Sequence, residues 1–312
     1  MRVLDSIDER TIGELLGRRE FFWLDLVGAS DAELARLAER FGWHPLALED
    51  STHFGQRPKL DRYGDHMLLV FYGARRGAHE TPEVIEVHVL VSGDWVVTVR
   101  RTPCAELEAI RARLREEPPE SEQFVVYRIL DTLTDTFFPV LEAIDDAIDE
   151  LEDAIVLQPD DEQLQRVFHL KRTLVTLRRI VTPQRDLAAR TIDEIGDLPG
   201  LDPGTRDYFR DVYDHLIRVS DMVDSYRDLL TGAMDVYLST VSNRLNAVMK
   251  QLTLVATVFL PITALTGFFG QNFGWLVLHV RSLWAFLVFG AGGAALSVLL
   301  LYAWFKRSRF ID

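Results

Sequence analysis

Two uncharged stretches lie almost back to back near the end of the sequence. Residues 251–280 and 282–305 contain no Asp, Glu, Lys or Arg. Each is long enough for a transmembrane helix, which needs roughly 20 mostly apolar residues. We therefore expect a helical membrane hairpin at the end of an otherwise charged chain. One such hairpin is too small to enclose a pore, so any transport would require an oligomer.

The charge of the chain is acidic and unevenly distributed. Its 312 residues include 34 Lys and Arg against 48 Asp and Glu, which gives a formal net charge of −14. This balance argues against nucleic-acid binding, because phosphate backbones attract cationic surfaces. Residues 129–165 contain no Lys or Arg, and acidic residues crowd between positions 145 and 153. That segment either attracts cations or is a solvated surface.

The flanks of the hairpin indicate its orientation. Arg244 and Lys250 precede the hairpin and Lys306 follows it, so the positive-inside rule puts both termini in the cytoplasm and the turn at residues 275–281 outside. The first twenty residues carry both charge signs without an apolar core, so we expect no cleavable signal peptide. The single cysteine, Cys104, excludes a disulfide framework and a thiolate-rich metal site.

The chain up to about residue 119 has an α/β pattern. Runs rich in β-branched and aromatic residues predict strands at 21–27, 66–74, 84–91 and 95–100. Two helices are also expected here. Ser30 and Glu33 form a capping box before a helix that ends near Phe41, and the second helix covers residues 105–117, before Pro118 and Pro119.

The remaining soluble part is helical throughout. Apolar residues three and four positions apart predict one long amphipathic helix over residues 130–155, which ends before Pro159. Residues 164–181 predict its antiparallel partner. The longest pattern, over residues 205–269, predicts a helix of roughly 100 Å that bundles with other helices around an axis and bends at Pro261.

The predicted fold class is an α+β membrane protein, with a cytoplasmic α/β domain, a long helical funnel and two transmembrane helices per subunit. The expected division is a cytoplasmic α/β domain (1–119), an antiparallel helical pair (120–200), a long stem helix (201–250), a first, pore-lining transmembrane helix (251–271), an external loop with a filter (272–282), a second transmembrane helix (283–305) and a basic cytoplasmic tail (306–312).

Small and polar residues recur on one face of the first span and of the segment before it. Their oxygen atoms could accept hydrogen bonds from the tightly held water shell of Mg²⁺, and an apolar ring could close the path by dewetting. The same stripe would also suit packing of one transmembrane helix on its neighbours, and a glycine at the outer end could simply cap the helix. The stripe contains Asn246, Met249, Leu252, Leu260, Thr263 and Gly267, and Gly270, Gln271 and Asn272 follow at its outer end.

Several longer motifs make the sequence similar to a known family. They are QRPK at 56–59, YFRDVYDH at 208–215, DVYLSTVSN at 235–243, NAVMKQLT at 246–253, PIT at 261–263 and GFFGQN at 267–272. Through these motifs the chain resembles the CorA family of bacterial divalent-cation transporters over nearly its full length.

The resemblance implies a homopentameric funnel in the bacterial inner membrane, embedded in lipid, with a divalent cation as its cargo and no other cofactor. It implies an ion filter, which Gly270, Gln271 and Asn272 match, with pore-lining residues below it. Met249 and Leu252 match the apolar gate. Asp211 matches a carboxylate that binds regulatory Mg²⁺ between subunits and so holds the channel closed.

The sequence departs from the family pattern at three places. Gln271 replaces the methionine of the usual Gly-Met-Asn filter. The outer loop at residues 273–282 has no acidic side chain to gather cations. The turn at residues 73–79, where an acidic partner of Asp211 is usual, contains Arg75 and Arg76, which would repel Mg²⁺ or pair with Asp211 directly.

Three functions follow from this pattern. The first is passive uptake of Mg²⁺ and Co²⁺. The second is Zn²⁺ transport of the ZntB type, driven by protons or not, with His279 as the one nitrogen ligand near the path. The third is a membrane sensor that does not transport. An enzyme is not expected, because the histidines are scattered and no glycine-rich phosphate loop precedes a helix.

Overall fold

The computed structural model describes residues 1–77, 81–119, 122–195, 206–271, 273–279 and 282–307. The chain forms two compact units, Met1–Tyr237 and Leu238–Asp312. The first unit contains a mixed sheet and most of the helices. The second contains the two spans.

The sheet of the first unit has six strands in the order β1-β2-β6-β5-β4-β3. The strands β1, β2 and β6 are parallel to one another, whereas β6, β5, β4 and β3 pair in antiparallel fashion. The strands are β1 (Arg2–Leu4), β2 (Phe22–Val27), β3 (Lys59–Tyr63), β4 (His66–Arg75), β5 (Glu83–Ser92) and β6 (Trp95–Arg100).

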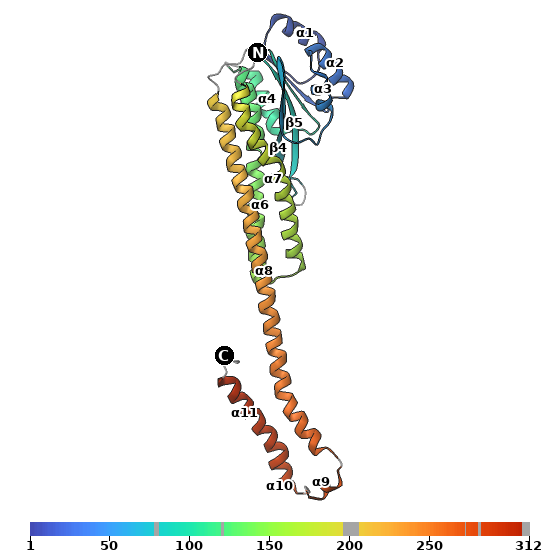
Figure 1. The fold of residues 1–312 in the computed structure, drawn as a ribbon, viewed down its shortest axis with the longest axis vertical. Helices are drawn as coiled ribbons and strands as arrows, with labels where there is room; N and C mark the ends of the chain where they lie inside the picture. The colour runs from blue at the N-terminus through green and yellow to red at the C-terminus, as the bar shows by residue number, and fades with distance from the viewer. Residues whose placement is uncertain (78–80, 120–121, 196–205, 272, 280–281, 308–312) are drawn as a thin grey trace. The chain divides into compact units, whose positions relative to one another are not determined.

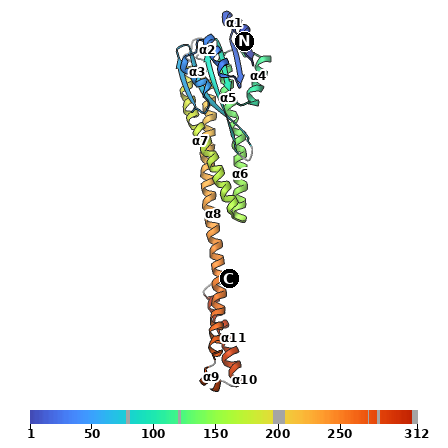
Figure 2. The same cartoon turned by 90° about the vertical axis from the view of Figure 1, so that its right-hand side faces the viewer.

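Helices cover both faces of this sheet (Figure 1). On one face lie α1 (Glu9–Arg18), α2 (Asp31–Phe41) and α3 (Pro45–Thr52), which are at the upper right of the strands in Figure 1 and overlap the strands in the turned view (Figure 2). The helices of the other face are α4 (Ala105–Glu116), α5 (Glu122–Asp135), α7 (Asp161–Ile195) and the first part of α8 (Arg206–Phe269). The capping box of Ser30 and Glu33 at α2 is confirmed.

The alternating side chains of the strands build a separate apolar core on each face. Phe22, Leu68 and Val97 pack with α1–α3 on one side. Trp23 and Leu69 pack with α4, α5, α7 and α8 on the other. Because the period of a strand is two residues, neighbours along a strand enter opposite cores. This explains why the strands are apolar on both sides.

In the first unit, four short elements were not anticipated from the sequence and one long helix was predicted wrongly; in the second unit, α9 lies where an external loop was expected. The unanticipated elements are β1, α1, α3 and β3. The helix expected over residues 130–155 is two helices, α5 and α6 (Phe137–Leu157), which meet at Thr136. The helical hydrogen bond to the Asp135 carbonyl is missing here because Pro139 has no N–H to donate. In addition, the Thr136 hydroxyl accepts a hydrogen bond of 2.8 Å from the Ala74 N–H of β4.

Side chains of the helices complete the edge of β4 where β3 ends. The buried Gln184 of α7 accepts from the Tyr72 N–H (2.7 Å) and donates to the Tyr72 carbonyl (3.0 Å), as a neighbouring strand would. Gly73 lies against Thr136, whose Oγ1 would be 2.7 Å from an added Cβ. The sheet and the helical stem are thus joined by hydrogen bonds to the backbone of one strand.

A buried ion pair joins β2 to β6. Asp25 and Arg100 are both fully buried and bonded to each other. Asp25 also accepts from the Thr98 hydroxyl (2.7 Å) and from Arg111 of α4 (2.9 Å). Charges can be buried in this way only when partners replace the lost water.

The second unit is a hairpin of two helical segments. The outer part of α8 is followed by α9 (Gly274–His279), α10 (Leu283–Ala285), a π-helical stretch η3 (Phe286–Gly292) and α11 (Gly293–Arg307). Both Arg206–Phe269 and Leu283–Arg307 are long and apolar enough to cross a membrane, and their most apolar windows are not buried in the chain itself. The chain is therefore a membrane protein with two candidate transmembrane helices.

We predict that Asp25→Asn lowers the free energy of unfolding by about 3–5 kcal/mol, because Arg100 would remain buried without its counter-charge. Urea unfolding followed by circular dichroism measures this change. Asp94→Asn, at an exposed turn position, is the matched control and should change stability by less than about 0.5 kcal/mol. Equal effects of the two substitutions would contradict a structural role for the pair.

Candidate functional site

The stripe expected to line a pore occupies one exposed face of α8 in the second unit. At 3.6 residues per turn, its members fall within about one third of the helix circumference. Asn246, Thr263 and Gly267 are exposed. The apolar members are exposed as well, with fractions of 58% for Met249, 62% for Leu252 and 71% for Leu260.

The opposite face of α8 contacts the second span. Leu265 and Phe269 line a cavity of about 710 Å³ together with Phe286 and Gly290 of η3. Leu265 also lies close to Gly293, where an added Cβ would be 3.7 Å from its Cδ1. The stripe residues from Asn246 to Gly267 do not line this cavity, whereas Gly270 and Gln271 at the outer end do. The partner of the stripe from Asn246 to Gly267 must therefore be another chain, lipid or a pore.

The threonine hydroxyls of the span are already committed as donors. Thr253 donates to the Met249 carbonyl (2.7 Å) and Thr263 donates to the Phe259 carbonyl (2.8 Å). A hydroxyl that donates its only hydrogen in this way can still accept hydrogen bonds through its lone pairs. The outward side of Thr263 can therefore accept a hydrogen bond from a water molecule that is bound to a cation.

The outer end of α8 is tight at Gly270. Its N–H donates to the Thr266 carbonyl (2.9 Å) and the Gln271 N–H donates to the Phe268 carbonyl (3.3 Å). Among the described glycines, left-handed φ occurs at four positions of the first unit and not at Gly270. A Cβ at Gly270 would instead be 3.0 Å from the Thr266 oxygen. The glycine thus permits a close approach of backbone, rather than the left-handed cap that its position had suggested.

Of the three expected filter residues, Gly270 and Gln271 are described and Asn272 lies outside the described residues. Gln271 is exposed. The assignment of all three residues to a filter therefore stays a prediction, as does the assignment of Met249 and Leu252 to a gate.

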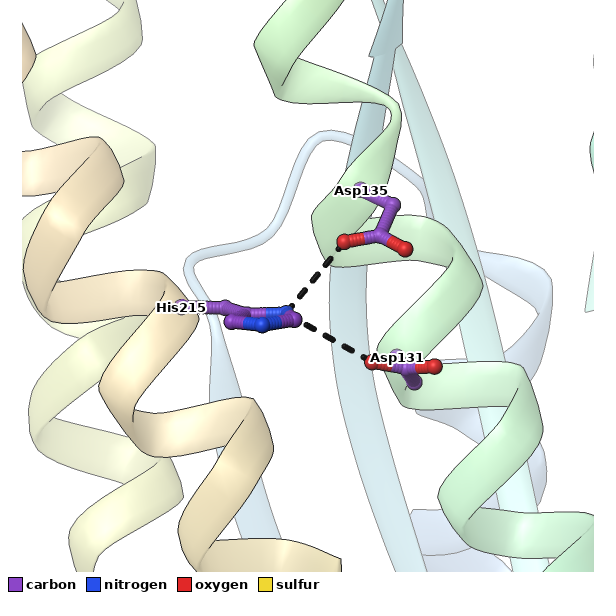
Figure 3. A group of neighbouring side chains, drawn as sticks. All are labelled: Asp131, Asp135 and His215. Atoms are coloured by element: carbon purple, nitrogen blue, oxygen red, sulfur yellow. Dashed lines mark ion pairs between the residues drawn. The ribbon is translucent and has the colours of Figure 1, made fainter.

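A second cluster surrounds Asp211 in the first unit. His215, one turn further along α8, lies between carboxylates of α5 (Figure 3): its Nδ1 is 3.3 Å from Asp135 and 3.6 Å from Asp131. Its Nε2 is 3.8 Å from Asp211. The Tyr127 hydroxyl donates to Asp211 (3.2 Å). Ligand atoms of Asp131, Asp135 and His215 all lie within 4.8 Å of one another, which suits a single metal ion.

The electrostatics of this cluster favour a bound cation. Burial, together with the neighbouring carboxylates of Asp135 and Asp211, raises the pKa of Asp131 above its ordinary value. Burial, together with the carboxylates of Asp131 and Asp211, raises the pKa of Tyr127. The buried Asp131 Oδ1 and His215 Nδ1 have no hydrogen-bond partner. A divalent cation would offset the mutual repulsion and bind both atoms.

Sequence reasoning identified Asp211 but missed Asp131 and Asp135, and it counted His215 only among the scattered histidines. The His215 ring lies edge-on to the Phe138 ring, with the two ring centroids 6.0 Å apart. The only signal for the missed pair was two acidic residues four positions apart, a spacing that is common on solvated helices. Their proximity to His215 depends on how α5 packs on α8.

The basic turn after β4 is partly neutralised within the chain. Arg75 Nε donates to Glu83 (2.8 Å), and Arg76 Nε donates to the Pro139 carbonyl (3.1 Å). These contacts engage the two side chains that were expected to repel Mg²⁺ or to pair with Asp211.

His279 of α9 stacks on Trp275, with ring centroids 4.6 Å apart, and its Nδ1 lies 2.9 Å from the Trp275 carbonyl. Within the part of the chain that the structure describes, the cluster of Asp131, Asp135 and His215 is the one grouping of three potential metal ligands. His279 therefore belongs to no grouping of three such ligands there.

Curated relatives of the chain are transport proteins. It is 33% identical over 296 residues to the cobalt/magnesium transport protein CorA of Thermotoga maritima, covering 93% of this chain and 83% of that protein. It is also 33% identical to the putative metal ion transporter YfjQ of Bacillus subtilis, covering 94% and 90%. A zinc transport protein, ZntB of Pectobacterium carotovorum, is 28% identical, covering 70% and 66%.

Solved structures share the fold. The complete CorA magnesium transporter of Methanocaldococcus jannaschii matches with a TM-score of 0.80 at 23% identity, covering 93% of this chain and 91% of that one. The full-length CmaX protein matches with a TM-score of 0.73, covering 92% and 88%. A model of the family described as CorA-like Mg2+ transporter protein matches residues 18–307. The chain therefore belongs to the CorA-like Mg²⁺ transporter family.

Proposed function

We propose that this divalent-cation transporter admits Mg²⁺, and Co²⁺ with it, passively into the cytoplasm through a homopentameric pore. The observation that carries the proposal is the polar stripe of α8 from Asn246 to Gly267, which faces away from the second span of its own chain. When several copies surround an axis, this stripe forms the wall of the pore. A membrane potential of 100 mV favours entry of a divalent ion by about 4.6 kcal/mol, since each charge contributes about 2.3 kcal/mol.

We assign a different role to the residues at each level of the stripe. The amide groups of Gln271 and Asn272 meet the hydrated ion at the outer end, beside Gly270. Thr263 supplies hydroxyl oxygens, and Asn246 supplies a second ring of amides. The exposed Met249 and Leu252 close the path between Asn246 and Thr263, because a narrow apolar ring excludes water and hydrated ions.

The transporter is proposed to lie in the bacterial inner membrane with both termini in the cytoplasm. Arg244 and Lys250 flank the first span, and Lys306 and Arg307 end the second. Basic residues are retained on the cytoplasmic side during insertion. The filter then faces outward, toward the source of ions.

Asp211 is proposed to work with Asp131, Asp135 and His215 as a cytoplasmic sensor of divalent cations. A cation there would join α5 to α8, the helix that continues into the stripe. The imidazole also gives this cluster some affinity for Co²⁺ and Zn²⁺, because these ions accept nitrogen ligands more readily than Mg²⁺ does.

Transport of Zn²⁺ is the second candidate. The likeness to a zinc transport protein, together with Gln271 in place of the usual methionine, favours it. Coupling to protons belongs to this alternative. A sensor that does not transport is the third.

We predict that vesicles containing the protein take up Mg²⁺ when the interior is negative, and that Asn272→Ala reduces the rate at least tenfold, because one ring of amide acceptors is lost. Asn243→Ala is the matched control, since Asn243 is an exposed amide of α8 off the stripe, and it should keep the rate. Isotopic uptake of Mg²⁺, Co²⁺ and Zn²⁺ measures the effect.

Equal uptake by Asn272→Ala and wild type would remove the filter assignment. Uptake of Zn²⁺ alone, or only with a proton gradient, would favour the second candidate. Absence of flux for every ion would favour the third.

A second prediction concerns the cation sensor. Because the pKa of Asp131 is raised, its ionised form weakens the folded state at neutral pH and this cost is relieved as the pH falls. Asp131→Asn should therefore raise the Tm of the ion-free protein. It should also reduce the increase in Tm that Mg²⁺ produces. For wild type, a Mg²⁺ concentration of a hundred times Kd stabilises the folded state by about 2.7 kcal/mol.

Thermal unfolding in detergent, with and without Mg²⁺, measures both changes. Asp214→Asn, an exposed neighbour on α8, is the control and should respond to Mg²⁺ as wild type does. An undiminished response to Mg²⁺ in Asp131→Asn would place the cation elsewhere.

A further inference from the structure

The outer turn of the hairpin carries a continuous apolar surface. Phe273, Trp275 and Leu278 are exposed by 66%, 63% and 62%. These residues belong to α9 or directly precede it. Exposure of this extent in consecutive large apolar side chains indicates an interaction surface. The turn also has no acidic side chain between residues 273 and 282, and most of its side chains are apolar.

The other side of α9 is occupied by the hairpin itself. Leu276 and Val277 line the cavity that Leu265, Phe269 and Phe286 also line. The helix is thus apolar on both sides: one side lines the cavity of the hairpin, and on the other Trp275 stacks on His279 and remains largely exposed. A second apolar medium must therefore cover the exposed side.

The position of α9 along the chain identifies that medium. The uncharged part of α8 runs from Gln251 to Phe269, about 28 Å at 1.5 Å per residue. This length matches the hydrocarbon core of a bilayer, about 30 Å. The turn that follows therefore begins where the hydrocarbon ends and the headgroups start. The apolar surface of α9 thus lies in sequence between the two candidate transmembrane helices.

The polar groups of α9 suit the same depth. The Trp275 ring stacks on His279, and the imidazole bonds to the Trp275 carbonyl, so both rings have one fixed arrangement. Tryptophan is enriched at the membrane interface because its ring is apolar and its N–H is polar. Arg281 in the following sequence adds a cationic side chain, which lipid phosphates attract.

We propose that α9 lies in the boundary between headgroups and acyl chains of the outer leaflet, with Phe273, Trp275 and Leu278 inserted in lipid. The turn is then a lipid-binding anchor that holds the outer end of the hairpin at a set depth. This inference rests on the membrane location of the two spans and not on which ion is transported. A second copy of the chain is the competing cover for the same surface.

Site-directed spin labelling of the full chain in phosphatidylethanolamine–phosphatidylglycerol vesicles tests the proposal. Phe273→Cys, Trp275→Cys and Leu278→Cys are labelled one at a time with a nitroxide. Burial leaves the native Cys104 1% exposed and raises the pKa of its thiol to about 11, so the unmodified chain is the blank. Power saturation then compares access of O₂, which dissolves in lipid, with access of a neutral, water-soluble nickel chelate.

Arg57→Cys, in an exposed loop of the first unit, is the control for water, and Leu299→Cys and Leu300→Cys in α11 are the controls for lipid. We expect the ratio of O₂ to nickel access at the three α9 positions to be several times that at Arg57→Cys and to approach the higher of the two α11 values. Nickel access equal to that at Arg57→Cys would overturn the proposal, because the turn would then lie in water.

Low access of both reagents at the α9 positions would also overturn it and would indicate contact between copies. If neither α11 control is exposed to O₂, the membrane location of the hairpin fails, and with it the basis of the inference. Uptake of Mg²⁺ by unmodified protein in the same vesicles separates this failure from failure of the proposed transport. Three independent positions keep the test informative if one variant does not fold.

Discussion

The structure depends on one constraint, which is that a chain in hydrocarbon must satisfy its own polar groups. Helices do this for the backbone. The side chains follow the same rule on α8, where Thr253, Thr257, Thr263 and Thr266 all donate to carbonyls of their own helix. A polar stripe that also faces away from the second span is not needed for packing within the chain. Its oxygen atoms remain available to water and hydrated ions.

The same helix carries the cluster around Asp211. α8 contributes His215 and Asp211, and α5 contributes Asp131 and Asp135. The three carboxylates repel one another, and Arg128, 3.7 Å from Asp131, offsets this repulsion only in part. Binding of a cation or a proton would therefore change how tightly α5 and α8 pack. Thr136, directly after α5, and Gln184 of the neighbouring α7 both bond to the backbone of β4. Because these hydrogen bonds hold the end of α5 and α7 to the sheet, a change in packing at the cluster would move α8 relative to a fixed sheet.

Local signals predicted the strongly periodic elements, and contacts between distant residues account for what was missed. The capping box at Ser30 and the length of α8 follow from adjacent residues. The break at Thr136 depends on a bond to Ala74, some sixty positions away, and only Pro139 hinted at it. Asp131 and Asp135 are recognised as possible metal ligands only because His215 lies beside them in the structure, and the sequence does not predict this proximity. The division into domains and the filter remain predictions.

The outer turn shows how a local departure from the family pattern changes the physics of entry. An acidic loop would raise the local concentration of cations before they reach the filter. Residues 273–282 have no such charge, and an α9 inserted in lipid would keep its apolar side chains away from the path. Attraction of the ion then depends on the membrane potential and on the dipoles of the amide groups beside Gly270. Selectivity and entry would accordingly be determined at the same short segment of chain, Gly270 to Asn272.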